Sequence, residues 1–472
     1  MYIQNRQYHL LTIAVSVSFT IIMTWCVSAH IFFWDTVQLG AKHGIHFYET
    51  RFAEILLPDN FDSGHLPIFG MYLAFTWMIF GKSLFVSHFA MLPFLIGIIF
   101  QAYFLIKKYV PEKDVPYALV LFLIQPTLLG QSILISPDIP LVFFFLLALN
   151  GVLSNRRILL LLGIAGLFLI SMRGAMLSFG ILLLDLYFNF KQFKSRYFIT
   201  LSKMSLSYLP GFILFGLYNY YHYLNKGWIG YHDDSPWAGS FQHVDIFGFL
   251  RNIVILGWRL VDFGNIFLWI TGLWLFYKYF ATLTKDKRFI NLVIVFFVIL
   301  GCLSVSFLSY NGLNAHRYIL PVYLTFSLLV IFMLYNSPVV GKSKIFILIC
   351  IGLLSGHLWI YPKPISQGWD ASLAHFPYYE LRDKILQDLK AQNIGIEEVA
   401  CVFPNQSEMR YMDLTGSKLK HTPFDHNTSK YVLYSNVFND FSDEDTQILT
   451  EKFKVLNHHK KFGVFMTLYK KK

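Results

Sequence analysis

The chain has 472 residues, of which 55% are hydrophobic, 18% are aromatic and only 14% are charged. Because an ordinary soluble domain is about one quarter charged, this composition excludes a water-soluble globular protein. The net charge of +11 does not indicate nucleic-acid binding either, because no basic stripe with interleaved aromatic residues is present. The excess positive charge lies in short loops between apolar runs, as the positive-inside rule predicts for a membrane protein.

Apolar runs long enough to cross a hydrocarbon core recur through residues 1–360, and they predict about eleven transmembrane helices. Their approximate ranges are 9–29, 84–106, 115–135, 139–154, 158–172, 174–190, 204–221, 264–281, 289–309, 318–336 and 343–360. Basic pairs such as Lys107-Lys108 and Arg156-Arg157 mark cytoplasmic ends, which places residues 361–472 outside the cytoplasm. The first run lacks a cleavage site of small residues, so we interpret it as a membrane helix and not as a signal peptide. The sequence therefore predicts a multi-pass protein of the plasma (inner) membrane.

The segment 30–83 is too long for a simple connection and too amphipathic to lie in water alone. Two stretches of this segment, 36–47 and 70–80, are typical of helices that lie in the plane of the membrane interface. A third stretch of the same kind lies elsewhere in the chain, at 249–263. Most acidic residues of the membrane part fall on the predicted outer side. We therefore expect the functional site on that side.

After Tyr361 the composition changes to that of a soluble domain. The pattern predicts a helix at 378–391, strands at 398–403 and 430–434, a helix at 443–456 and a strand at 462–469. Such alternation indicates a small α/β domain. The chain thus divides into an all-α transmembrane domain, 1–360, with the outer loop 30–83, and a soluble outer-face (periplasmic) domain, 361–472.

Two carboxylates on the predicted outer side are candidates for catalysis. Asp35 follows the first span among aromatic residues, where partial loss of hydration makes a carboxylate more basic and suits a general base. Asp138 lies in a very short outer loop at 136–140. Either residue could instead cap the helix that follows it. Together with His65 they could also hold a divalent metal, and the sequence leaves that question open.

Five basic side chains at the outer membrane boundaries are candidates for contacts with a phosphate group. They are His65, Arg173, Arg259, His316 and Arg317. Arginine binds phosphate through two parallel N–H donors, and a cation near lipid needs a polar partner. The alternative for each arginine is a side chain that only extends to the interface. The pairs His222/His232 and Asp233-Asp234 are expected to be solvated loop residues.

Three motifs, in this order, resemble those of the C-type (GT-C) glycosyltransferases. The most similar group is the bacterial branch of the protein O-mannosyltransferase and aminoarabinose-transferase superfamily, and the likeness covers about residues 1–360. The first motif is Asp35 after the first span, followed by Phe80-Gly81-Lys82-Ser83 before the second span. The second is Ser136-Pro137-Asp138-Ile139-Pro140 with the apolar run that follows it. The third is His316-Arg317-Tyr318-Ile319-Leu320-Pro321.

This resemblance implies a GT-C fold and transfer of a sugar from a polyprenyl-phosphate carrier to an acceptor on the outer face, with inversion at the anomeric carbon. Asp35 takes the place of the catalytic carboxylate, and Asp138 that of the second outer-loop aspartate. His65 stands where members carry Lys-Pro-Pro or His-Pro-Pro, but Leu66 replaces the middle proline. Thr36 replaces the glutamate that follows the aspartate in the mannosyl branch. These departures leave the sugar and the acceptor (a hydroxyl or phosphate group of a lipid, glycan or protein) open. A phosphate acceptor would need no base, and Asp35 would then only orient it.

Two other classes compete with this interpretation. A transporter or flippase of a lipid-linked sugar would show inverted repeats and polar groups near the bilayer midplane, which the sequence lacks. An envelope polysaccharide polymerase or ligase would also work on the outer face, but it would not require an aspartate at the end of the first span. We therefore predict a membrane glycosyltransferase whose partners are a lipid-linked sugar and the surrounding lipid, with no nucleic acid. No cofactor is certain, and a divalent metal stays open.

Overall fold

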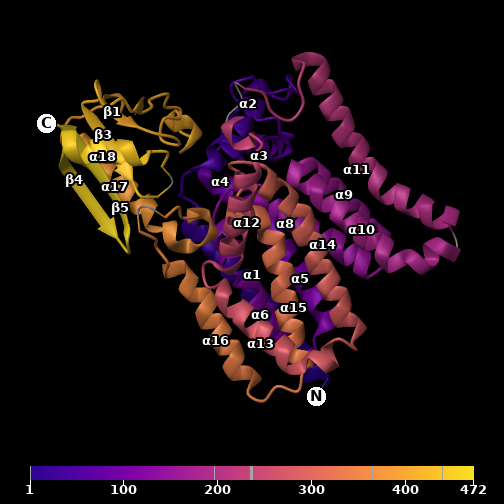
Figure 1. The fold of residues 1–472 in the computed structure, drawn as a ribbon. Helices are drawn as coiled ribbons and strands as arrows, with labels where there is room; N and C mark the ends of the chain where they lie inside the picture. Colours follow the sequence, from indigo (N-terminus) through magenta and orange to yellow (C-terminus); the bar gives the residue numbers. More distant parts are fainter. Residues whose placement is uncertain (1, 196, 234–237, 363–364, 438) are drawn as a thin grey trace.

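The computed structural model describes residues 2–195, 197–233, 238–362, 365–437 and 439–472. Figure 1 shows a bundle of helices, with the C-terminal sheet domain (yellow) against one end of it. Among the described residues, six helices are long and apolar enough to cross a membrane, and the number rises to seven if one bent helix pair is counted as a single span. The predicted polytopic helical architecture and the small C-terminal α/β domain are thus confirmed. The remaining predicted spans correspond to helices that do not meet this criterion on their own.

The first half of the chain forms short and long helices in alternation. They are α1 (Tyr2–Val27), α2 (His43–Thr50), α3 (Ile68–Phe80), α4 (Leu84–Phe89), α5 (Leu92–Tyr109), α6 (Val115–Leu123), α7 (Pro126–Ser132), α8 (Asp138–Leu153), α9 (Arg157–Ile170) and α10 (Met172–Ser195). A π-helical segment, η1 (Val37–Lys42), leads directly into α2. The predicted interfacial stretches 36–47 and 70–80 are therefore helical, the first as η1 with α2 and the second as α3.

The second half of the membrane part contains the most deeply buried helix. Its helices are α11 (Tyr197–Lys226), α12 (Ile246–Val261), α13 (Asn265–Leu283), α14 (Lys287–Ser309), α15 (Leu320–Asn336) and α16 (Lys342–Ser355). The span that contains α15 is 94% buried, whereas the span of α1 is 11% buried. α15 therefore forms the centre of the bundle, whereas α1 lies at its periphery, where lipid can cover its apolar surface.

The predicted single span at 115–135 is wrong in one respect, because the chain bends by 66° between α6 and α7. Pro126 begins α7, so it lacks the N–H that would continue the hydrogen bonds of α6, and it forces Gln125 into an extended conformation. The Gln125 side chain accepts a hydrogen bond from the N–H of Leu128 at 3.0 Å and so caps the new helix. The bend turns α7 towards the C-terminal part of the chain, which it contacts.

The C-terminal domain is a five-stranded sheet with two helices. Its elements are α17 (Pro377–Ala391), β1 (Val399–Cys401), β2 (Thr422–Pro423), β3 (Tyr431–Ser435), α18 (Asp443–Lys452), β4 (Phe453–Lys461) and β5 (Val464–Lys471). The strand order is β2-β1-β3-β5-β4. β1 is parallel to β2 and β3, and β5 is antiparallel to β3 and β4.

The predicted helix at 443–456 is too long, because the chain becomes strand β4 at Phe453. The hairpin between β4 and β5 turns through Phe462 and Gly463, which both have positive φ angles. A two-residue turn of this hand matches the twist of paired strands and stabilises the hairpin. Pairing with β5 therefore overrides the helical pattern that continues past Lys452.

The two parts of the chain share a hydrophobic cluster. Val27 and Phe33 from the end of the first span, with Ile133 after α7, pack in the same cluster as Tyr378 and Leu381 of α17. Because this apolar surface is buried between them, the C-terminal domain packs against the helical bundle and is not connected to it by a flexible linker alone.

Candidate active site

A cavity of about 1170 Å³ lies between the helix ends and the C-terminal domain. All seven site residues predicted from the sequence line it: Asp35, His65, Asp138, Arg173, Arg259, His316 and Arg317. They come from segments that are far apart in the chain, so the fold brings together what the sequence lists separately. Residues of the C-terminal domain, such as Phe441 and Lys460, line the opposite wall.

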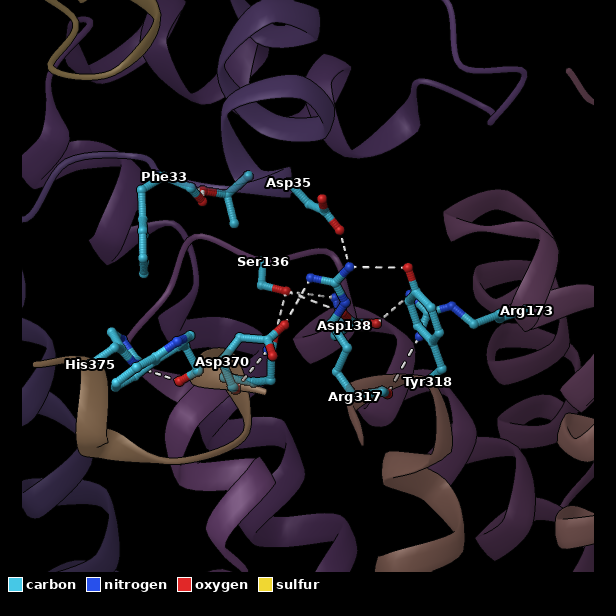
Figure 2. Close-up of polar contacts among 12 residues, drawn as sticks. Phe33, Asp35, Ser136, Asp138, Arg173, Arg317, Tyr318, Asp370 and His375 are labelled. Atoms are coloured by element: carbon cyan, nitrogen blue, oxygen red, sulfur yellow. Dashed lines mark hydrogen bonds and ion pairs between the residues drawn. The ribbon is translucent and has the colours of Figure 1, made fainter. Parts of the chain in front are cut away.

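Arg317 lies at the centre of the polar cluster in this cavity (Figure 2). Its Nη2 donates a hydrogen bond to Asp35, and its Nη1 donates to Asp370 at 2.9 Å. Nη2 also lies 3.1 Å from the hydroxyl of Tyr318, and Nε lies 3.6 Å from Asp138 Oδ2. Arg317 is buried. A rigid guanidinium can hold several carboxylates in a fixed arrangement, and here it fixes three.

Asp138 forms a second ion pair, with Arg173. Nη2 of Arg173 lies 2.6 Å from Asp138 Oδ1, and its guanidinium lies over the Tyr318 ring at 4.5 Å. The alternative that Asp35 and Asp138 serve as helix caps is not supported, because η1 and α8 begin without a side-chain cap. Arg173 and Arg317 likewise do not extend into lipid, because both point at carboxylates.

Asp370 belongs to this cluster and was not predicted from the sequence. It lies in a short 3-10 turn, η6 (Trp369–Ala371), after the last membrane helix. The Gln131 side chain donates to the Asp370 carbonyl at 3.0 Å and accepts from the Ser136 hydroxyl at 2.6 Å. A single acidic residue between Trp369 and Ala371, in a stretch assigned to the soluble domain, was the only signal in the sequence. Only tertiary packing places it beside Arg317.

His316 faces Asp262 and not the open cavity. Its Nε2 lies 2.7 Å from Asp262 Oδ2, and the Tyr361 hydroxyl donates to the other oxygen of the same carboxylate. Burial alone would raise the pKa of Asp262, but the hydrogen bonds from His316 and Tyr361 outweigh it and hold that pKa below its ordinary value. His316 Nδ1 lies against Gly368, where a Cβ would stand 2.3 Å away. The His316 ring therefore packs against the backbone of Gly368, which forms part of the cavity wall.

Arg259 is held less tightly than the other two arginines. Its Nη1 lies 3.7 Å from Asp262 Oδ2, and its Nε donates to the carbonyl of Asn314 at a long 3.4 Å. The side chain lines the cavity. Arg259 therefore has donor capacity to offer a ligand, whereas the N–H groups of Arg317 are directed at carboxylates.

The turn that carries His65 is anchored to the C-terminal end of α11. Asp62 Oδ2 lies 2.9 Å from Nε2 of His222 and 2.9 Å from Nζ of Lys226, and Asp62 Oδ1 accepts from the N–H of Gly64 at 2.9 Å. The expectation that His222 is a solvated loop residue is wrong, because it is buried against Asp62. Asp62 and His222 are 160 positions apart in the chain, so no local sequence pattern predicts this pair.

His65 is uncharged at neutral pH. Burial, together with the nearby Arg173, lowers the pKa of His65 to about 4, and the opposing effect of Asp62 is smaller. The imidazole can therefore donate or accept a hydrogen bond in the cavity, but it does not bring the positive charge expected of a phosphate contact.

Replacing Gly64 with alanine should destabilise this turn strongly. Gly64 has a φ angle of +73°, and a Cβ there would lie 0.9 Å from the carbonyl oxygen of Gly230. The left-handed conformation costs an alanine about 1–2 kcal/mol, and the clash adds to that. Thermal unfolding in detergent should show a lower Tm for Gly64→Ala than for Gly227→Ala, because Gly227 has a φ of +79° but no described atom within 4 Å. Equal shifts for the two variants would mean that the contact with Gly230 does not hold the turn.

The cavity does not have the composition of a metal site. In the described part of the chain, no three His, Cys, Asp or Glu side chains come close enough together to hold a metal ion. Asp35 and Asp138 each form an ion pair with a guanidinium group, which would compete with a metal ion for their oxygens. The residues present therefore do not fit the divalent metal that the sequence left open.

These features define a class of protein: a polytopic helical membrane protein with a large cavity, which holds a cluster of ion pairs, between its helix ends and a small α/β domain. The crystal structure of ArnT from Cupriavidus metallidurans bound to undecaprenyl phosphate has this fold. It aligns with 96% of this chain and 97% of its own length, at a TM-score of 0.54 and 11% identity. The predicted ArnT-like GT-C fold is thereby confirmed.

Two further solved structures align at a TM-score of 0.49. The apo form of the same ArnT is 12% identical and covers 97% of this chain and 97% of its own. The arabinofuranosyltransferase AftD from Mycobacteria is 11% identical, and the alignment covers 97% of this chain and 39% of AftD. Comparison by sequence finds no match among protein families or curated proteins.

Proposed function

We propose that this protein is a membrane glycosyltransferase that transfers a sugar from a polyprenyl-phosphate carrier to an acceptor on the outer face of the membrane. The observation that carries the proposal is the ion pair between Asp35 and Arg317 in the large cavity of a GT-C fold. In this pair Asp35 can accept a proton from the acceptor, and Arg317 holds the Asp35 carboxylate in position. The ArnT of the same fold was crystallised with undecaprenyl phosphate, which supports a lipid phosphate as part of the donor.

The proposed step is a direct displacement at the anomeric carbon. Asp35 accepts the proton of an acceptor hydroxyl, whose oxygen forms the new bond to the sugar while the bond to the carrier phosphate breaks. The leaving phosphate gains one negative charge, and a cation placed there in advance stabilises the transition state. Arg259 is the most available guanidinium for that contact, while Arg317 and Arg173 hold the carboxylates in place. Attack from the side opposite the leaving group inverts the anomeric configuration.

The purified protein should use a lipid-linked sugar and not the corresponding nucleotide sugar. A site at the outer face has no supply of cytoplasmic nucleotide sugars, and no glycine-rich diphosphate loop is evident in the sequence. The measurement is transfer of radiolabelled sugar in proteoliposomes that receive both donor types in parallel, for several sugars.

Efficient transfer from a nucleotide sugar, with none from any lipid-linked donor, would contradict the proposed function. Movement of the lipid-linked sugar across the bilayer without transfer would favour the flippase. Growth of a polymer from a lipid-linked oligosaccharide would favour a polymerase or ligase.

The proposed mechanism also requires that the cavity and residues 361–472 lie outside the cytoplasm. Single cysteines introduced as Lys418→Cys and Arg156→Cys, in a chain without the four native cysteines, should label differently in intact cells. Lys418→Cys should react with a membrane-impermeant maleimide, and Arg156→Cys should react only after the cells are permeabilised. The opposite pattern would reverse the orientation and remove the argument for a lipid-linked donor.

A further inference from the structure

A second cavity, of about 420 Å³, lies on the far side of the helix that follows Asp35. Asp35, Leu39 and His43 line the large cavity, whereas Lys42 lines the small one. The helical segment η1 therefore separates the two cavities. The other wall of the small cavity is a loop of the C-terminal domain, between β1 and β2, that includes Arg410.

Lys42 has no carboxylate partner. Its ammonium group lies 5.7 Å from the centre of the Phe61 ring and 5.9 Å from that of Tyr411. No hydrogen bond or ion pair joins Lys42 to any residue in the described part of the chain. Burial lowers the pKa of Lys42 below its ordinary value, and the attraction of Glu408 opposes this shift only in part. Two aromatic rings stabilise a cation only modestly, so the N–H donors of the Lys42 ammonium group remain available to an anion.

The opposite wall of the small cavity brings more donors. Arg410 lies there with Lys420 and the neutral donors Gln406 and Ser407, and the Glu408 carboxylate also lines the cavity. Arg410 is paired with Glu408 at 2.6 Å, so Lys42 and the exposed Lys420 are the uncompensated cations. They come from two separate parts of the chain, the loop after the first span and the C-terminal domain.

We propose that this small cavity, lined by Lys42, Lys420 and Arg410, binds a phosphate group. A tetrahedral oxyanion presents oxygens in several directions, so it can accept from a cation on each wall at once, and neutral Gln and Ser donors suit its remaining oxygens. The phosphate can belong to an anionic lipid headgroup or to a soluble molecule. The site does not depend on the proposed glycosyl transfer.

A ligand in this cavity would tie the C-terminal domain to the segment that carries Asp35. The two are already joined by a hydrogen bond from the N–H of Phe32 to the carbonyl of Met412, at 2.8 Å. A phosphate between Lys42 and the loop that carries Arg410 would add charge-assisted hydrogen bonds beside it. Since only the folded protein forms the cavity, the bound anion should stabilise the fold.

The test is thermal unfolding of the full chain in detergent, titrated with inorganic phosphate at constant ionic strength. Retention of phosphatidylglycerol against phosphatidylcholine, measured by native mass spectrometry, forms the second arm. The wild-type protein should show a saturable rise in Tm with phosphate, selective retention of phosphatidylglycerol, or both. Phosphatidylglycerol alone identifies a lipid headgroup as the ligand, and a response to inorganic phosphate identifies a site open to soluble phosphate.

Lys42→Gln should weaken binding of the responding probe at least tenfold, while Lys42→Arg should retain it. Lys420→Gln removes an exposed cation of the same cavity, so it provides a second test if Lys42→Gln does not fold. Lys418→Gln is the matched control, because Lys418 lies on the same loop but outside the cavity. The proposal is overturned if neither probe binds the wild-type protein saturably, or if the Lys42 and Lys420 substitutions leave binding at the level of the control.

Discussion

Asp35→Asn is expected to lower the rate of sugar transfer by about a hundredfold to ten-thousandfold, the usual effect of losing a general base. Asparagine has nearly the same shape and can still accept a hydrogen bond from Arg317, but it cannot take a proton from the acceptor. Arg317 keeps Asp370 and Asp138 as partners, so the variant should fold. Initial rates with a lipid-linked donor, together with Tm in detergent, separate the loss of catalysis from a loss of folding.

Asp59→Asn provides the matched control for this experiment. Asp59 also lies in the outer segment and pairs with a cation, Lys226, at 2.7 Å, but its side chain is 75% exposed. The control should keep its activity. If Asp35→Asn is folded and transfers sugar at nearly the wild-type rate, Asp35 only holds Arg317 in place and another group, or none, removes the proton.

The membrane part could be predicted because its signals are local. A run of apolar residues long enough to cross a bilayer indicates a span without reference to the rest of the chain. The apolar spans Gln7–Val27 and Lys287–Ser309 lie within two residues of the predicted ranges 9–29 and 289–309. The bend at Pro126 is also predictable from the sequence, because proline cannot continue a helix from the preceding turn. It was missed because the apolar run continues through it.

The predicted site residues all line one cavity, but their pairing could not be predicted. Arg317 was expected to face a phosphate, and in the structure it faces Asp35 from a position 282 residues away. Asp370 was assigned to the soluble domain, since the sequence gives no sign that the chain returns to the cavity after α16. Contacts at such separations depend on the packing of the whole bundle.

The balance of charge in the cavity has a consequence for substrate binding. Asp35, Asp138 and Asp370 face only two guanidiniums, Arg317 and Arg173, so this cluster carries one negative charge in excess. A phosphate would be repelled from its centre. The donor phosphate is therefore expected beside Arg259, at the edge of the cluster, with the sugar between Arg259 and Asp35.

Arg317→Gln is expected to have the largest effect on stability of any single substitution in the cavity. Removing one partner of a buried ion pair leaves the other charge uncompensated and typically costs about 3–5 kcal/mol. Here the loss would leave Asp35 and Asp370 without a cation. We expect a markedly lower Tm in detergent, and weaker use of the lipid-linked donor by whatever fraction remains folded, because Asp35 would no longer be held in position.

Two further variants distinguish charge compensation from a simple loss of packing. Arg288→Gln removes an exposed arginine from its pair with Asp286, at 2.8 Å, and should cost less than about 1 kcal/mol. The double variant Arg317→Gln with Asp370→Asn removes a cation and one of the carboxylates that it neutralises. Its Tm should therefore lie above that of Arg317→Gln alone. If the second substitution lowers the Tm further by its full separate effect, the two groups are not coupled. Arg317 would then stabilise the fold through contacts other than its carboxylates.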